Sequence, residues 1–152
     1  MNSPATIQAP RTPAEWTAYY ALRYTVLRQP WQQLPGSERV PADNEPDTVH
    51  ALLLTETTGT PEALAVGMLQ PTGAYQGQIR FMAVAPEAAG TGLGQRVMAH
   101  LEAQARAAGL REIVLHSRET AVGFYEKLGY TMVEPSHLLF GEIQHFLMRK
   151  QL

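Results

Sequence analysis

Cysteine is absent from the 152-residue sequence. Its absence excludes disulfide bonds, zinc sites built on thiolates and a cysteine nucleophile, and it is typical of a reducing compartment, so we expect a cytoplasmic protein. Long hydrophobic runs are absent as well, since the apolar stretch nearest the N-terminus, 51–54, is far shorter than the roughly 20 residues of a membrane-spanning helix. The first 13 residues contain no apolar core, so we expect no secretory signal and no association with a membrane.

The sequence also lacks an excess of one charge. It has 12 Lys and Arg against 14 Asp and Glu, a net charge of −2 and no basic cluster, so nucleic acid is not an expected partner. The histidines show no HExxH pairing and no neighbouring carboxylate cluster, so no metal site is expected. Apolar residues make up 45% of the chain, which at this length predicts one globular domain over residues 1–152.

The main feature that is present is the stretch 79–108. An apolar run predicts a strand over 78–85, and Pro86 ends it because proline cannot donate to a sheet ladder. Apolar residues at helical spacing then predict a long helix from about Gly92 to Gly109. The stretch therefore reads as a strand, a turn and a helix.

Three glycines, Gly90, Gly92 and Gly94, lie in that turn. They permit backbone angles closed to other residues and leave no side chain against an approaching ligand. A helix N-terminus behind such a turn presents free N–H groups and the positive end of the helix dipole, so it is an anion site, most naturally for phosphate. On spacing alone, a tight turn without a ligand explains the glycines equally well, and the spacing fits neither a Rossmann fingerprint nor a P-loop.

The remaining elements are predicted from periodicity and turn residues. One helix is expected over 13–28, where Thr12 caps and Glu15 completes a capping box, and a shorter one follows a cap at Ser117 or Thr120. Strands are expected near Ile7 and over 49–55, 63–70, 111–117, 130–133 and 143–149, with turns at 57–60 and 73–77.

The order of these elements predicts the fold class. Because a helix separates the strand 78–85 from the strand 111–117, the two should be parallel neighbours. We therefore expect an α/β (α+β) fold, with an antiparallel N-terminal meander, a central parallel strand pair that splays, and flanking helices. A splayed pair leaves a crevice where ligands commonly bind. The irregular segment 31–47 fits either a functional loop or a rigid connector.

Two motifs resemble those of the GNAT superfamily of N-acetyltransferases. Residues 80–98, RFMAVAPEAAGTGLGQRVM, resemble its acetyl-CoA motif, a strand followed by Arg/Gln-x-x-Gly-x-Gly/Ala and a helix. Gly92 and Gly94 match the two small positions, and Ala89 stands at the Arg/Gln position. Residues 121–130, AVGFYEKLGY, resemble the second hallmark of the family, A-x-x-F-Y-x-K-x-G-F/Y.

Two further stretches, LRYTVLRQ (22–29) and GEIQHFLMRK (141–150), are similar to the ElaA-type branch, in which Ile-x-His-x-x-Met closes the chain. With them the resemblance spans nearly the whole sequence. It implies an enzyme that transfers the acetyl group of acetyl-CoA to a primary amine of a small molecule or a peptide, directly and without a covalent enzyme intermediate. It is compatible with a homodimer and implies no metal.

The resemblance also implies which residues bind acetyl-CoA. The pyrophosphate would lie on the N–H groups of the glycine turn, and the N–H of Val84 would donate to the thioester carbonyl. Arg118 would contact the pantetheine or reach a phosphate. The expected cofactor-binding residues are Met82, Ala83, Val84, Ala89, Gly90, Thr91, Gly92, Leu93, Gly94, Arg118 and Tyr125.

Tyr125 is implied to protonate the leaving thiolate, because a phenol is a hydrogen donor near neutral pH. Packing beside Phe124 is the alternative role of its ring. Adjacent helical residues point about 100° apart, so we expect Phe124 to face the core and Tyr125 to face the cofactor channel.

At the position where many family members have a glutamate as catalytic base, this sequence has Gln78, so another residue is expected to act as the base. His145 is the preferred candidate, since imidazole titrates in the useful range and the ElaA-type ending places a histidine there. A role in the core fits His145 equally well. Arg80 and His116 are expected at the acceptor, where Arg80 would hold a carboxylate or another anion unless it forms a surface ion pair. The other candidate bases are Glu38, Glu45, Glu142 and His50, of which His50 is expected to be structural.

Two other functions remain compatible with the sequence. A non-catalytic acyl-CoA binding or sensing module would account for Ala89 and Gln78. A nucleotide-dependent oxidoreductase would account for the glycine turn taken alone.

Overall fold

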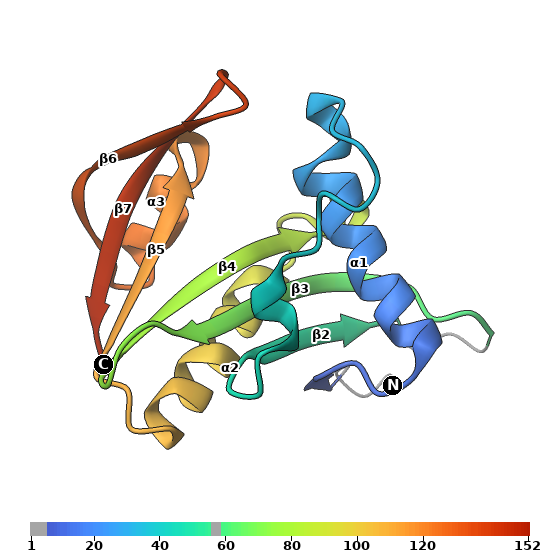
Figure 1. The fold of residues 1–152 in the computed structure, drawn as a ribbon, viewed down its shortest axis with the longest axis horizontal. Helices are drawn as coiled ribbons and strands as arrows, with labels where there is room; N and C mark the ends of the chain where they lie inside the picture. The colour runs from blue at the N-terminus through green and yellow to red at the C-terminus, as the bar shows by residue number, and fades with distance from the viewer. Residues whose placement is uncertain (1–5, 56–58) are drawn as a thin grey trace.

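The computed structural model describes residues 6–55 and 59–152. The strands of these residues form one mixed sheet in the spatial order β1-β2-β3-β4-β5-β7-β6 (Figure 1). They are β1 (Ile7–Gln8), β2 (Val49–Leu54), β3 (Ala63–Pro71), β4 (Gln76–Val84), β5 (Glu112–Arg118), β6 (Thr131–Leu139) and β7 (Ile143–Gln151). The helices are α1 (Pro13–Leu27), α2 (Leu93–Ala107) and α3 (Val122–Lys127), and short 3₁₀ turns cover Gln29–Trp31, Pro41–Asn44, Pro86–Ala88 and Glu119–Ala121. The predicted mixed α/β fold is confirmed.

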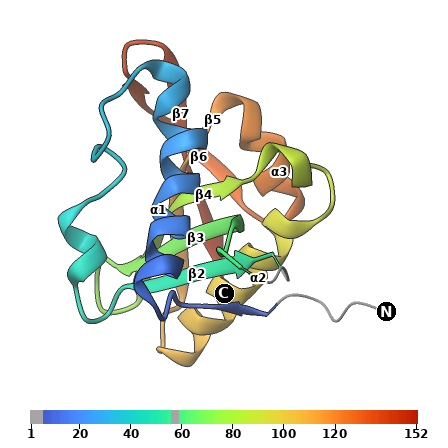
Figure 2. The ribbon, with the colours of Figure 1, turned by 90° about the vertical axis from the view of Figure 1, so that its right-hand side faces the viewer.

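Helices α1 and α2 cover opposite faces of the strands β2 to β4 (Figure 2). Side chains alternate between the two faces along each strand, and this decides which helix each one meets. On β2, Leu52 packs in one cluster with Tyr19 and Leu22 of α1. Its neighbour Leu53 packs in the other cluster, with Leu101 of α2. The central strands are therefore buried on both faces, as their apolar runs predict.

The predicted parallel pair, β4 and β5, separates partway along its length. Residues 76–79 of β4 pair with residues 112–115 of β5. Beyond them β4 continues along β3, whereas β5 continues along β7 as far as the pair Arg118 and His145. The ribbon is consequently V-shaped, with β5, β6, β7 and α3 in one arm and α1 with β2 to β4 in the other (Figure 1).

A β-bulge bends β4 where the two strands separate. Phe81 and Met82 together stand opposite Gly67 of β3, and Phe81 has a φ of 56°. A positive φ is strained for an aromatic residue, so the surrounding packing must hold it. Gly67 has no room for a side chain, because a Cβ there would lie 2.6 Å from Met82 Sδ. A bulge re-aims the side chains of its strand, and Phe81 here reaches the cavity between the arms.

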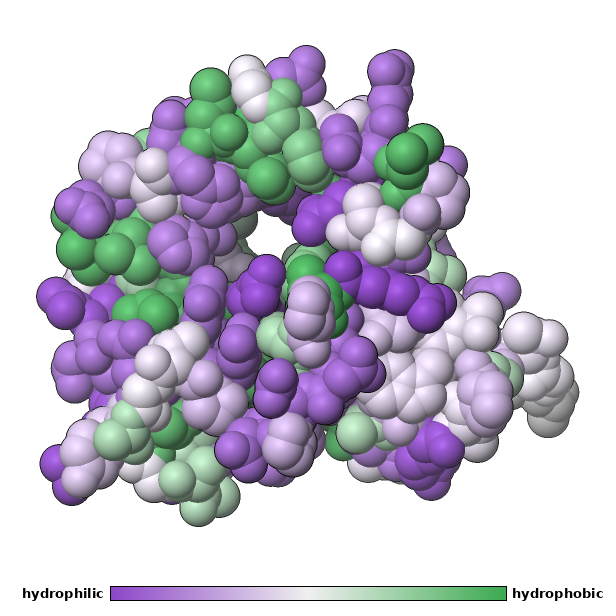
Figure 3. All heavy atoms as spheres, in the orientation of Figure 1, coloured by the Kyte–Doolittle hydropathy of each residue, from purple (hydrophilic) through white to green (hydrophobic). Residues whose placement is uncertain are grey.

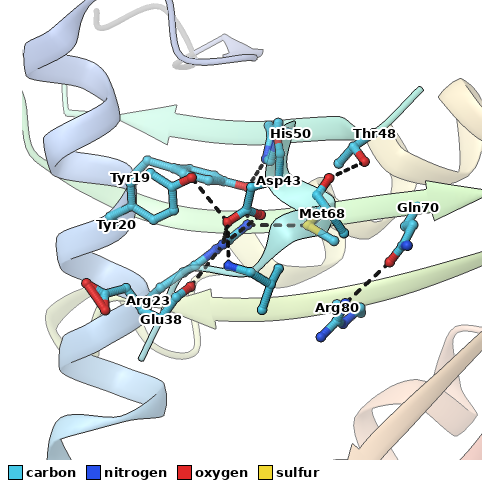
Figure 4. A network of polar contacts seen from close by, with 12 residues as sticks. Tyr19, Tyr20, Arg23, Glu38, Asp43, Thr48, His50, Met68, Gln70 and Arg80 are labelled. Atoms are coloured by element: carbon cyan, nitrogen blue, oxygen red, sulfur yellow. Dashed lines mark hydrogen bonds and ion pairs between the residues drawn. The ribbon is translucent and has the colours of Figure 1, made fainter. Parts of the chain in front are cut away.

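A buried ion pair attaches the irregular segment after α1 to the body of the protein (Figure 4). Arg23 is fully buried, and its Nη1 donates to Asp43 Oδ2 at 2.9 Å. Its Nη2 donates to the Tyr19 hydroxyl at 3.0 Å, which in turn lies 2.8 Å from His50 Nδ1. Since both charges are out of water, breaking the pair would be costly. The segment is therefore fixed in place, and His50 belongs to this structural network.

Two local predictions about helix caps are wrong. Thr12 accepts from the Glu15 N–H at 3.1 Å, as predicted, but the Glu15 carboxylate accepts from the Arg11 N–H at 2.9 Å, so no capping box closes on Thr12. Neither Ser117 nor Thr120 caps α3, because a 3₁₀ turn comes first and the N-cap position has no side-chain bond.

Strand β6 is longer than the predicted strand 130–133. It continues through Pro135, which an edge strand tolerates because the missing N–H faces no neighbour. The other strand and helix predictions are confirmed to within a few residues. The turn predicted over 57–60 lies partly outside the described residues.

Candidate active site

A cavity of about 900 Å³ lies between the arms of the V, where β4 and β5 separate. Figure 3 shows an opening that passes through the molecule at this place, so the cavity has a mouth on each side. Two aromatic rings, Trp31 and Phe140, bridge the open end of the V with their centroids 6.4 Å apart. Two mouths allow two ligands to reach one point from opposite sides.

The glycine turn between β4 and α2 forms one wall of the cavity. Gly90 and Gly92 have φ angles of 78° and 84°, in the left-handed region that glycine adopts most readily. Gly92 is the N-cap of α2, and no side chain caps the helix. The Arg96 N–H donates to the Gly92 carbonyl at 3.2 Å, so the N–H groups of residues 93–95 have no partner within the helix. These residues line the cavity, as an anion site at this helix requires.

The predicted cofactor-binding residues lie together around the cavity, with one exception. Thr91 does not line it, because its hydroxyl donates to the Ala88 carbonyl at 2.5 Å and closes the turn. Gly94 lies against the ring of Phe124, and a Cβ there would be 3.2 Å from Phe124 Cζ. Lining the cavity are Met82, Ala83, Val84, Ala89, Gly90, Gly92, Leu93, Gly94, Arg118 and Tyr125.

The edge of β4 that faces the cavity carries a backbone donor. The Ala85 N–H donates to the Leu64 carbonyl on the β3 side at 2.8 Å. Successive N–H groups of a strand point to opposite edges, so the N–H of Val84 points to the edge from which β5 has separated. Val84 therefore offers a donor to a ligand in the cavity, and its contact with the thioester carbonyl stays a prediction from the family resemblance.

Tyr125 lines the cavity from α3 and is 8% exposed. Its hydroxyl makes no hydrogen bond within the described part of the chain, and burial raises the pKa of Tyr125 to about 12, against a smaller opposing effect of the Arg118 charge. The phenol is thus protonated at neutral pH. Tyr125 thus faces the cavity, as predicted. Phe124, which was expected to face the core, also lines the cavity and is less buried than Tyr125, so that part of the prediction is wrong.

Three histidines from three strands line the same cavity. His145 stacks on His137 with centroids 4.4 Å apart, and His137 lies 5.3 Å from His116. His145 Nδ1 lies 3.0 Å from the Ile143 carbonyl, to which it donates, and this leaves Nε2 free to accept a proton. Burial, reinforced by the charge of His137, lowers the pKa of both His145 and His116, so both are neutral at pH 7.

Sequence reasoning missed His137 for a structural reason. The strand was predicted to end at Val133, and the register of β6 shifts between Pro135 and Leu138. A predicted strand that continued through Pro135 would have placed His137 beside β7. His116 and His145, which the sequence analysis named for separate roles, both line the cavity, from strands β5 and β7.

The charged residues of the cavity are all basic. Arg28, Arg80 and Arg118 line it, whereas no aspartate or glutamate of residues 6–55 and 59–152 does so. Arg28 was not predicted, because nothing in the sequence links the end of α1 to the strand β4. Gln78 lines the cavity, and the alternative bases Glu38, Glu45, Glu142 and His50 lie outside it.

The described residues contain no group of histidine, aspartate and glutamate side chains placed to hold a metal ion. They also contain no helix with the length and apolar character needed to cross a bilayer.

A parallel strand pair that splays, with a glycine turn and an open helix N-terminus beside it, is the fold of the GNAT class of N-acyltransferases. The model of the acetyltransferase (GNAT) family matches residues 15–130, and the chain belongs to that family. The alternative of a nucleotide-dependent oxidoreductase, drawn from the glycine turn alone, is not supported by this membership.

Similar proteins include both solved structures and a curated protein. The structure of Escherichia coli ElaA has a TM-score of 0.77 and 18% identity, with 95% of this chain and 97% of that chain covered. An aminoglycoside 6'-N-acetyltransferase complexed with coenzyme A has a TM-score of 0.79 and 17% identity, with 96% of each covered. A Bacillus subtilis (strain 168) protein named "Putative acetyltransferase" is 42% identical over 60 residues, and this match spans 40% of each protein. The two solved structures support the fold.

Proposed function

We propose that this protein is an N-acetyltransferase that transfers the acetyl group of acetyl-CoA to a primary amine of a small molecule or a peptide, directly and without a covalent enzyme intermediate. One observation carries the proposal: the glycine turn, the free edge of β4 and the side chain of Tyr125 all meet in one cavity. Bound acetyl-CoA would supply the activated acetyl group as a thioester. The protein has only to position the reactants and move protons.

The residues present fit the cofactor. The N–H groups of residues 93–95, which have no partner within the helix, and the positive end of the α2 dipole suit the pyrophosphate. The open edge of β4 suits the amide groups of the pantetheine arm, which can bond to it as a neighbouring strand would. The N–H of Val84 would then polarise the carbonyl at which negative charge develops.

Two side chains would move the protons. His145 Nε2 would accept a proton from the attacking amine, since Nδ1 is held by the Ile143 carbonyl. The Tyr125 hydroxyl would donate its proton to the departing sulfur. Both groups return to their starting states by exchange with water through the open mouths, so the transfer leaves the protein unchanged. Arg80 and His116 would contact the acceptor.

A non-catalytic acyl-CoA binding module is the second candidate, and one observation favours it. Gln78 lines the cavity at the position expected for a glutamate base, and no carboxylate among the described residues replaces it there. Such a module would bind acetyl-CoA through the same turn and release no thiol.

Acetyl-CoA offered with a panel of amines, with free thiol as the readout, tests the proposal. CoA binding is followed separately by the fluorescence of Trp31, which lines the cavity, and a Trp31→Phe variant shows which part of the signal comes from it. Thiol release that depends on the amine supports the acetyltransferase. Binding without amine-dependent release would favour the second candidate, and no binding would contradict both.

Three further proposals rest on composition, length and resemblance. They are a cytoplasmic location, a single domain over residues 1–152 and a homodimer. Light scattering of the purified protein tests the last of these directly.

A further inference from the structure

Two arginines from distant parts of the chain border the cavity beside one aromatic ring. Arg28 follows α1, and Arg80 lies on β4 just before the bulge. Their guanidinium carbons lie 5.4 Å and 5.1 Å from the centroid of the Phe81 ring. Both side chains line the cavity and are half-buried. The bulge that turns Phe81 into the cavity therefore also places its ring beside both arginines.

Neither arginine has an acidic ion-pair partner among the described residues. Arg28 donates from Nε to the Ser37 carbonyl at 3.1 Å and from Nη1 to the Leu27 carbonyl at 2.9 Å. Arg80 donates from Nη1 to Gln70 Oε1 at 3.3 Å. The ion pairs found among the described residues include neither of them. Their remaining N–H groups are available to a ligand.

The carboxylates whose charges reach these arginines are committed elsewhere. Asp43 is paired with the buried Arg23, and the Glu38 carboxylate accepts from a backbone N–H at 2.7 Å. Burial lowers the pKa of both Arg28 and Arg80, and the charge of Arg23 lowers it further. Two half-buried positive charges with no ion-pair partner of their own among the described residues favour the binding of an anion.

We infer that the acceptor amine carries a carboxylate or a phosphate group, and that Arg28 and Arg80 bind this group. The inference rests on the proposed N-acetyltransferase function and narrows its acceptor to an anionic amine. A guanidinium donates to two oxygens of either anion at once. The wholly basic lining of the described cavity agrees with this, and it would repel a polycationic acceptor such as an aminoglycoside.

The order of groups along β4 separates this site from the phosphates of CoA. Arg80 precedes Val84 by about 13 Å of strand, at roughly 3.3 Å per residue, whereas the glycine turn follows Val84. The thioester expected at Val84 would lie between the two anion sites. CoA would thus fill the site at the turn, and the acceptor would fill the site at the arginines.

Calorimetric titration of amines into the CoA-saturated protein tests the inference. Saturation matters because it occupies the turn, so an added anion cannot bind there. Glycine, leucine and phenylalanine are each compared with their amides, and phosphoethanolamine is compared with ethanolamine. The anionic member of a pair should bind at least about tenfold tighter, and the two kinds of pair separate carboxylate from phosphate.

Arginine variants assign the preference to its site. Arg28→Gln and Arg80→Gln should each reduce the ratio of anionic to neutral affinity toward one. Arg106→Gln should keep the wild-type ratio, because Arg106 is exposed on α2 and does not line the cavity. Circular dichroism confirms that each variant is folded.

Equal binding of charged and neutral members, or binding of neither, would overturn the anionic acceptor. A preference that survives in the double variant Arg28→Gln/Arg80→Gln would overturn it too, since another group would then hold the anion. If the wild-type protein does not bind CoA, the proposed function itself fails, and this appears in the first titration before any amine is added.

Discussion

Replacing Tyr125 with phenylalanine removes one oxygen atom and keeps the ring. The ring packs edge-to-face on Phe124 at 5.0 Å and on Tyr130 at 5.9 Å, and these contacts survive the change. The hydroxyl has no hydrogen-bond partner within the described part of the chain, so none is lost. The structure therefore predicts opposite effects of Tyr125→Phe on stability and on catalysis.

The two magnitudes follow from the position of the hydroxyl. A buried polar group without a partner costs about 1–3 kcal/mol, and this hydroxyl borders a cavity, so the free energy of unfolding should stay the same or rise by up to ~1 kcal/mol. Loss of proton delivery to the thiolate should lower kcat by about ten- to a thousandfold, which is about 1.4–4 kcal/mol of barrier. CoA affinity should not change.

Tyr130→Phe is the matched control. The Tyr130 hydroxyl donates to Glu102 Oε2 at 2.8 Å, and Tyr130 does not line the cavity. Its loss should lower the free energy of unfolding by about 1–3 kcal/mol, because a buried acceptor loses a partner, and leave kcat unchanged. The two tyrosine variants should therefore show reversed patterns.

The assay combines thiol release at saturating acetyl-CoA, calorimetric CoA binding and urea unfolding. Because burial raises the pKa of Tyr125 to about 12, the phenol stays protonated over the usual assay range and should add no basic limb to the wild-type pH–rate profile. Full activity of Tyr125→Phe on a verified acceptor would refute the reasoning and leave Tyr125 as a packing residue. A large loss of stability would refute the assignment of its hydroxyl as unbonded.

Three other predictions address the turn, the base and the buried ion pair. Gly92→Val should weaken CoA binding by at least about tenfold, because a φ of 84° costs a residue with a side chain about 1–2 kcal/mol and displaces the turn. The control variant Gly73→Ala should bind CoA with normal affinity by calorimetry, because Gly73 has open space around it and no positive φ. His145→Ala should lower kcat and flatten the acidic limb of the pH–rate profile. In the wild type the midpoint of that limb should lie below the ordinary histidine pKa, because burial lowers the pKa of His145. An unchanged profile would show that His145 only packs. Asp43→Asn should lower the free energy of unfolding by about 3–5 kcal/mol, because it leaves Arg23 buried without its ion-pair partner, and the melting temperature should fall by roughly 10 °C. Asp47→Asn changes an exposed residue, so the free energy of unfolding should stay within about 0.5 kcal/mol of the wild type. Equal stability of the two aspartate variants would show that the pair contributes little.

The strand, the glycine turn and the helix over 79–108 were predictable because each depends on short-range chemistry. Hydrophobic period, proline, and glycines at positive φ act within a few residues of one another, so the sequence carries their signals locally. The parallel pairing of β4 and β5 followed from the intervening helix and the handedness rule. The family resemblance rests on these same local stretches.

The helix caps and the placement of Phe124 depended on what surrounds each element. The Glu15 carboxylate accepts from the Arg11 N–H and closes no capping box on Thr12, because the path of the chain before α1 brings the Arg11 N–H to it. The burial of Tyr125 relative to Phe124 was set by how α3 packs on its arm, which the angle between adjacent residues on a helix does not specify.

The cavity's chemistry is where the tertiary structure decided most. Arg28, Arg80 and His137 come from the end of α1, from β4 and from β6, and no sequence spacing relates them. Their meeting depends on a bulge at Phe81 and a register shift in β6, both of which arise when strands pair over long range. The sequence alone thus determined that a glycine turn leads from a strand into a long helix, because backbone conformation is local. Only the folded chain decided that the opposite side of the cavity is basic and free of carboxylates among the described residues, because that property depends on which distant side chains the sheet brings together.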